Sequence, residues 1–442
     1  MRRDKKLLIQ EARALIMRVR QMQPFEMRMP MVGAASLSPG ASRAIRLHVL
    51  KMRDDLIDRL QRFEAGVHRY GRRYPAARLQ RKLTVIKMRF VSALFGYDVF
   101  ADVLTQRAEH ENGIWLAGLD AAAEDALKLP PSFEAPPIAC YLERGLGAAI
   151  RRAKTALPGR RKNPVAVIRI PRERMVGFGI SSSLIHEVGH QAEMLMGLSR
   201  ELKPKLAREA ERAAPRDRFA MRCYAQWTTE ILADSWGISH LGIAAPRGLM
   251  GVLSLPSAFL FRMKQGDPHP MPWLRVMLCL RLGAALYPDP QWRHFERIWK
   301  RLYPIPDAHR RPNSPVMKLI SGIDTFISRY LAHRPRSLDG MTMRDLLRRP
   351  GRNAARLRTR FAAFKRNPAS LSILRPTTAL AVLGQGFADH RLGTEEDSRT
   401  LARLLRRWAL KKNTDEPLGS QSTNRRATLP MMDAFALERT GE

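Results

Sequence analysis

Apolar residues recur at helical spacing along most of the chain, and this pattern predicts a protein built mainly from helices. The periodicity is continuous from residue 41 to about residue 126. In its first part the apolar positions that follow one another at steps of three and four are Ile45, Val49, Met52, Leu56 and Leu60. Such a stripe packs against the protein's own core or a partner helix, and we expect core packing. Further helices are predicted over residues 1–23, about 205–240 and about 271–286.

One short segment alternates instead of following the helical repeat, and it is the clearest predicted strand. In residues 165–170 valine and arginine at odd positions alternate with alanine and isoleucine at even positions, and prolines bracket the run. The expected fold is therefore α+β and predominantly α, with a small β-sheet.

Proline-rich stretches divide the chain into predicted domains. They lie at residues 129–141 and 303–315, where helical periodicity stops. The predicted parts are a helical N-terminal domain (1–128), a middle domain (138–302), a basic helical C-terminal domain (316–412) and a flexible tail (413–442).

The net charge of +36, with 61 arginines and 16 lysines, favours contact with polyanions such as nucleic acid or acidic membrane. A bias toward arginine can also reflect the base composition of a genome. Residues 344–366 carry nine basic residues and one acidic residue, so a polyanion contact is possible there. Phe361 and Phe364 could stack on bases. Together with Leu357 they also form a helical stripe, which favours core packing.

Cysteine usage and hydropathy bear on the compartment. Cys140, Cys223 and Cys279 form no C-x-x-C pair, which argues against a disulfide framework and suits a reducing compartment. Polar residues interrupt the basic N-terminal segment 1–21, and no run of 18 apolar residues occurs. We expect neither a signal peptide nor a membrane span, and therefore a soluble cytoplasmic protein.

The strongest chemical signal is the segment SSSLIHEVGHQAEMLMG (181–197), which contains His-Glu-x-x-His. His186 and His190 lie about one helical turn apart, so both imidazoles can bind one metal ion. Glu187 is rotated by about 100°, beside the metal, where it can act as general base. Zinc is the expected ion because it accepts imidazole and carboxylate ligands. Gly189 permits another segment to approach this helix closely.

A catalytic zinc site needs a third protein ligand, which we expect in YAQWTTEILADSWGISH (224–240). Glu230 and Asp234 are four residues apart in this largely apolar stretch, so they share a helix face. We assign Glu230 as the ligand, with Asp234 accepting a hydrogen bond from the outer nitrogen of a ligating histidine. The rivals are Glu193, expected to be exposed, and His240, expected to be an ordinary core or surface histidine.

The motif H-E-x-x-H followed by E-x-x-x-D resembles the gluzincin metallopeptidases. Within them, EILADSWG (230–237) and GDPHPMPWLRVMLCL (266–280) resemble the CAAX prenyl proteases and the heat-shock membrane metalloproteases. The resemblance, which covers roughly residues 160–285, implies a zincin-like catalytic domain. It also implies that His269 and Arg275 lie at the active site, near the substrate carbonyl or its oxyanion.

The chain departs from that family in two ways. The family members are typically membrane proteins, whereas no span is predicted here. The separation of 40 residues between His190 and Glu230 implies an insertion, the charged segment 199–219, which we expect to be exposed.

The sequence thus predicts a metalloendopeptidase that binds one Zn²⁺ per chain and cleaves peptide or protein substrates. The strand at 165–170 is expected to hold an extended peptide by backbone pairing. The alternatives are a nucleic-acid-binding protein that uses 344–366, and a non-catalytic member of the zincin fold. The presence of Glu187 argues against the second alternative.

Overall fold

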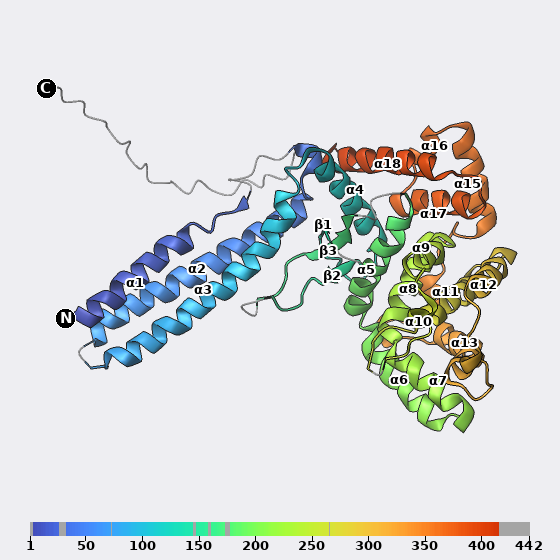
Figure 1. Ribbon diagram of the computed structural model, residues 1–442. Helices are drawn as coiled ribbons and strands as arrows, with labels where there is room; N and C mark the ends of the chain where they lie inside the picture. Colours follow the sequence, from blue (N-terminus) through green and yellow to red (C-terminus); the bar gives the residue numbers. More distant parts are fainter. Residues whose placement is uncertain are drawn as a thin grey trace.

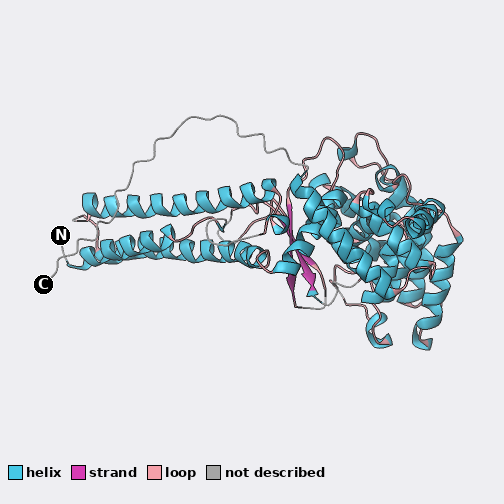
Figure 2. Ribbon diagram, turned by 90° about the horizontal axis from the view of Figure 1, so that it is seen from above, coloured by secondary structure: helices cyan, strands magenta, loops and turns pink. Residues whose placement is uncertain are grey.

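The computed structural model of the chain describes residues 3–25, 32–71, 73–144, 147–157, 161–172, 177–264 and 266–414. These residues form mostly helices and one three-stranded sheet (Figures 1 and 2). The predicted α+β class, predominantly α with a small sheet, is confirmed. Within the described residues, no helix combines the length and apolarity needed to cross a bilayer.

Three long helices form a bundle that projects from the rest of the protein (Figure 1). They are α1 (Arg3–Arg20), α2 (Pro39–Tyr70) and α3 (Ala76–Thr105). α2 begins where Ser38 accepts a hydrogen bond from the Ala41 N–H and Pro39 occupies the first turn. The predicted stripe of α2 is buried, which confirms core packing: Met52, Leu56 and Leu60 pack against α1 and α3. Ile45 and Val49 instead join a cluster that includes Val167 of the sheet.

The sheet contains β1 (Ile138–Glu143), β2 (Ala149–Arg151) and β3 (Ala166–Pro171) in the order β1-β3-β2. β3 is the predicted strand, and it pairs parallel to β1 and antiparallel to β2. β2 occupies the second edge of β3 at Val167–Arg169, so the expectation that a peptide could pair with this strand is wrong there. The two outer edges of the sheet belong to β1 and β2.

The remaining helices pack into one body. They are α4 (His110–Ala126), α5 (Gly179–Met196), α6 (Leu198–Arg212), α7 (Pro215–Gln226), α8 (Thr228–Leu241), α9 (Ala244–Val252), α10 (Ser257–Leu260), α11 (Pro272–Leu286), α12 (Pro290–Leu302), α13 (Pro315–Ala332), α14 (Met343–Leu347), α15 (Ala354–Arg366), α16 (Ala369–Ser372), α17 (Pro376–Ala388) and α18 (Thr394–Thr414). One hydrophobic core runs from Leu116 of α4 to Trp408 of α18. The predicted domains 138–302 and 316–412 thus share a core, and α4 from the range 1–128 contributes to it. The predicted tail lies outside the described residues beyond Thr414, the end of α18.

α5 and α8 lie in close contact, and Gly189 is the reason. A Cβ atom on this glycine would lie 2.8 Å from the Cα of Ala233 and 2.9 Å from the Cβ of Trp236. The expectation that Gly189 allows close approach is therefore confirmed. α5 ends at Gly197, which adopts φ +67, the left-handed conformation that glycine accommodates without strain.

The helical region expected over about 205–240 is helical, and it consists of three helices, α6, α7 and α8, interrupted near residues 213–214 and at Trp227. One other expectation changes here. The insertion 199–219 is not simply exposed, because α6 buries one amphipathic face consisting of Leu198, Leu202, Leu206 and Ala210.

The basic segment 344–366 falls on α14 and α15. Leu357, Phe361 and Phe364 are buried in the main core. The aromatic rings are therefore not available to stack on bases. A polyanion contact through the remaining basic side chains stays a prediction.

Candidate metal centre

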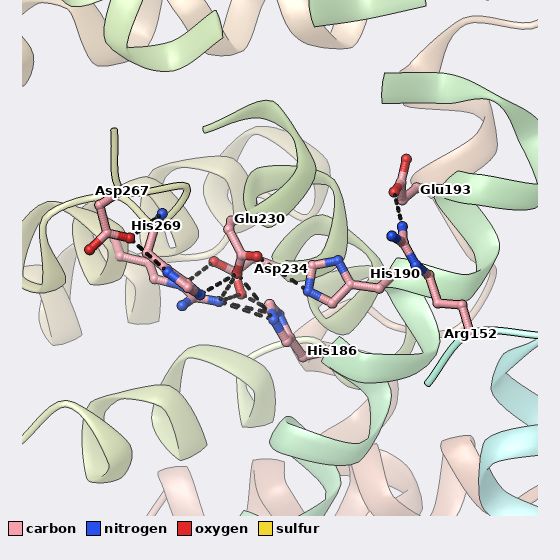
Figure 3. A network of polar contacts seen from close by, with 9 residues as sticks. Arg152, His186, His190, Glu193, Glu230, Asp234, Asp267 and His269 are labelled. Atoms are coloured by element: carbon pink, nitrogen blue, oxygen red, sulfur yellow. Dashed lines mark hydrogen bonds and ion pairs between the residues drawn. The ribbon is translucent and has the colours of Figure 1, made fainter. Parts of the chain in front are cut away.

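Two packed helices supply the candidate metal ligands. α5 carries His186 and His190 one turn apart, and their ring centroids lie 4.7 Å from each other at an interplanar angle of 83°. α8 carries Glu230, which faces both rings (Figure 3). One ligand atom from each of these three residues lies within 4.8 Å of the others, so the group could hold a metal ion.

The donor geometry agrees with a cation site. The Nε2 atom of His186 lies 3.4 Å from Oε2 of Glu230, and Nε2 of His190 lies 3.4 Å from Oε1. Oε2 of Glu230 is buried and makes no hydrogen bond with a described residue, although Nη2 of Arg275 lies 3.3 Å from it. A cation between this oxygen and the two histidine nitrogens would give it a further partner of opposite charge.

Asp234 lies behind His186 and orients it. Its Oδ1 atom is 2.8 Å from Nδ1 of His186, which is the contact expected from the sequence. Arg275 holds the same carboxylate, with Nε 2.7 Å from Oδ2 and Nη2 2.9 Å from Oδ1. This contact favours a proton on Nδ1 and turns Nε2 of His186 toward Glu230, and Nη2 of Arg275 also lies 3.3 Å from Nε2.

Burial and neighbouring charges shift the pKa values of the three candidate ligands. Burial lowers the pKa of His186, but the Asp234 carboxylate outweighs it and raises the value to about 9. Burial and the nearby His186 charge lower the pKa of His190 to about 4. Burial raises the pKa of Glu230, yet His186 and Arg275 bring it down to about 2. A metal ion would therefore compete with a proton on His186.

His269 and Arg275 both lie at the centre, but in different settings. His269 is exposed, at 54 % of its side chain, and its Nε2 atom lies 3.6 Å from Oε2 of Glu230. Its Nδ1 atom lies 2.9 Å from Oδ1 of Asp267. Gln226 donates to the carbonyl oxygen of Asp267 at 2.7 Å and anchors this loop to α7. Arg275 is largely buried, with 12 % of its side chain exposed, and it also faces Glu230, with Nη2 3.3 Å from Oε2.

The two rival ligands lie outside the metal group. Glu193 was expected to be exposed, which is wrong: it is 2 % exposed, because the segment after β2 covers it and places Arg152 at 3.4 Å (Figure 3). His240 is a buried core histidine, with Nδ1 2.9 Å from the carbonyl oxygen of Trp236.

Two residues of the centre were not identified from the sequence. Asp267 orients His269 from two positions earlier in the same loop. Cys279 is buried, and burial together with its contact to Asp234 raises the pKa of its thiol. The sequence signal that could have identified Cys279 was its four-residue spacing from Arg275 on a predicted helix, which places both residues on one face.

Two cavities open at the centre. One of 210 Å³ is lined by residues that include His186, Glu187, Asp234, His269, Arg275 and Cys279. The other, of 810 Å³, shares His269 and Arg275 and continues along α7 past Trp227. Glu187 is largely buried, and this burial raises the pKa of its carboxyl group. A proton acceptor, Glu187, and one of the three candidate ligands, His186, thus line the same cavity.

Comparison of the chain with protein-family models, curated proteins and solved structures finds no match. The relation to gluzincin metallopeptidases therefore stays a prediction from the motifs quoted above. Any assignment of function must come from the geometry and chemistry of the centre.

Proposed function

We propose that the protein is a zinc-dependent metallopeptidase of gluzincin type, with one zinc ion per chain. The observation that carries the proposal is the convergence of His186, His190 and Glu230 from two helices. Two further features support it: Asp234 contacts the outer nitrogen of His186, and Glu187 lines the adjoining cavity.

The donor set fits zinc. Two imidazole nitrogens and one carboxylate are a common set of protein ligands in catalytic zinc sites, which keep one position open. His186, His190 and Glu230 would hold the ion. When bound, zinc would lower the pKa of a water molecule to about 7 and polarise a substrate carbonyl.

The side chains around the ligands would have three different roles: proton transfer, stabilisation of developing negative charge, and positioning. Glu187 would accept a proton from the attacking water and pass it to the leaving nitrogen, and its raised pKa makes it a better proton acceptor. The exposed His269 would donate to the oxygen on which negative charge develops. Arg275 would act mainly as a positioning residue, because its guanidinium is engaged with Asp234 and Glu230.

An extended substrate would pair with β2, since β1 and β2 occupy the two edges of β3 at Val167–Arg169. β2 lies beside α5. Gly147 and Ala148, which immediately precede the strand, line the 210 Å³ cavity together with Glu187. Backbone pairing along Ala149–Arg151 would therefore bring a peptide bond past the candidate general base.

Metal content and peptide cleavage test the proposal. We expect about one zinc per chain in the wild type, and its loss in His186→Ala and in Glu230→Ala. Glu187→Gln is expected to retain zinc and to lose at least about a hundredfold in cleavage of a peptide mixture, followed by mass spectrometry.

Glu193→Gln is the matched control, because Glu193 is buried on the same helix but lies outside the metal group. It should retain both zinc and activity. A wild-type protein that takes up no zinc, or a Glu187→Gln variant that cleaves as fast as the wild type, would refute the proposal.

A further inference from the structure

α3 carries a second apolar face that is not used in the core. Leu79, Leu83 and Ala93 pack inside the three-helix bundle. On the outer side Val85, Met88, Val91 and Phe95 follow at steps of three, three and four, and they are 54 %, 66 %, 49 % and 60 % exposed. No described residue covers this strip, and α3 forms an outer edge of the projecting bundle (Figure 1). We call these four residues the α3 strip.

Basic residues predominate around the first part of the α3 strip. Residues 76–97 contain five basic residues and no acidic residue, and the exposed Asp98 and Asp102 follow beyond Phe95, toward the end of α3. Lys87 pairs with Glu11 of α1. The other four, which make no salt bridge with any described residue, are Arg78, Arg81, Lys82 and Arg89. Arg78 and Lys82 lie over the ring of Tyr74, at 4.6 and 5.6 Å from its centroid. The strip is therefore bordered mainly by positive charge over residues 78–89, although Arg89 is close enough to the Asp55 carboxylate of α2 to interact with it electrostatically.

The apolar strip and the cations beside it together distinguish between three classes of partner. A nucleic acid would use the cations but would leave Val85 and Met88 against phosphate or water. A second copy of the chain would cover the apolar residues but would bring the same cations toward each other. An anionic lipid surface accommodates both features, because apolar side chains enter the boundary between headgroups and acyl chains while lysine and arginine contact anionic headgroups.

We propose that α3 is a docking surface for an anionic lipid bilayer. The helix lies along the membrane plane, with Val85, Met88, Val91 and Phe95 inserted and Arg81 and Arg89 at headgroup level. The contact is peripheral, since no described helix can span a bilayer. The bundle projects away from the main body in both views, so the main body does not cover α3 (Figures 1 and 2).

Co-sedimentation of the full chain with vesicles tests this inference. Vesicles of phosphatidylcholine alone are compared with vesicles of phosphatidylcholine and phosphatidylglycerol in a 7:3 ratio, at one salt concentration. We expect binding to the anionic vesicles to be at least about tenfold tighter, and to weaken as salt rises.

Paired substitutions separate the two components of the surface. Met88→Gln with Phe95→Gln removes apolar contact without changing the charge, and Arg81→Gln with Arg89→Gln removes charge. Each pair should weaken vesicle binding by about tenfold or more. Both pairs change exposed side chains, so far-ultraviolet circular dichroism should report an unchanged helix content. Ile373→Gln is the control, because Ile373 is 79 % exposed but isolated between α16 and α17, and it should bind like the wild type.

Several outcomes would overturn the proposal. Equal binding to neutral and anionic vesicles would show that charge does not contribute to the contact. Full binding by the Met88/Phe95 variant would show that the α3 strip does not contribute. Light scattering that shows a wild-type dimer and a monomeric Met88/Phe95 variant, with no vesicle binding by either, would identify a second copy as the occupant. Duplex DNA binding that depends on Arg81 and Arg89 but not on the strip, again without vesicle binding, would identify a nucleic-acid surface.

Discussion

Replacing Gly189 with alanine should separate the two helices that carry the metal ligands without changing any ligand. The new Cβ atom would lie 2.8 Å from the Cα of Ala233 and 2.9 Å from its carbonyl oxygen. Both are backbone atoms, so rotation of a side chain cannot relieve the overlap. Since carbon atoms in contact are normally about 3.5–4.0 Å apart, α5 and α8 must move apart by roughly 0.7 Å or more.

Two effects of this movement can be estimated. Overpacking in a core costs about 1–3 kcal/mol, and the higher helix propensity of alanine returns up to about 1 kcal/mol. With the full gain from helix propensity, the expected net loss in the free energy of unfolding is about 0–2 kcal/mol. Because His186 and His190 lie on α5 and Glu230 on α8, the same movement strains the ligand set, and we expect zinc affinity to fall by about tenfold or more.

The measurements are urea unfolding of the zinc-free protein and zinc titration in competition with a chromophoric chelator. Gly237→Ala is the matched control on α8, because its Cβ would meet Ala245 at an ordinary 3.5 Å. A Gly189→Ala variant with wild-type stability and wild-type zinc affinity would refute the account of the α5–α8 contact.

Three further predictions concern other parts of the molecule. Asp234→Asn should lower zinc affinity by about 10–100-fold, because it removes the carboxylate that orients His186. Burial raises the pKa of Asp397 to about 6 although the Phe178 N–H donates to it. The folded state therefore holds this proton more tightly than the unfolded chain, and its contribution to stability is lost as pH rises from about 4 to about 6, roughly 3 kcal/mol in all. Asp397→Asn should lack this dependence in urea unfolding across that range. Phe361→Ala should cost about 3–5 kcal/mol in unfolding free energy and leave retention on a polyanion column unchanged.

Each of these has a clear contrary result. Asp324→Asn is the control for Asp234→Asn, since Asp324 is an exposed partner of Arg281, and equal zinc affinities in the two variants would contradict the role of Asp234. Parallel pH profiles for wild type and Asp397→Asn would show that folding does not raise the pKa of this carboxyl group. A stable Phe361→Ala variant with weakened polyanion retention would show that the ring lies at a binding surface.

The features that depend on neighbouring positions in one helix were predictable. The stripe from Ile45 to Leu60 and the pairing of His186 with His190 both follow from helical geometry, because residues three and four apart share a face. The spacing of Glu230 and Asp234 follows the same rule. The close approach at Gly189 was also predictable, since an apolar helix containing a glycine can accept a neighbouring backbone.

Other features depended on segments far apart in the chain, and the sequence was misleading there. Glu193 is buried because the segment after β2 packs over it, a contact that its position on α5 does not reveal. The alternating strand was recognised, but alternation does not show how many neighbours a strand has, and β3 has two. Likewise, the charge of segment 344–366 suggested a binding surface with aromatic residues, but these aromatic residues are buried against α17. The exposed apolar strip lies on α3 instead.

The sequence by itself determined the predominantly helical class, the predicted β3 strand and the local faces of the two ligand-bearing helices, since these reflect interactions within a few residues. Only the tertiary structure decided that Glu230, 40 residues beyond His190, meets both histidines and that Arg275 holds Asp234 in place. It also decided which apolar residues remain outside the core. The physical reason is that helix periodicity specifies which side chains share a face, whereas the packing of the whole chain specifies what each face meets.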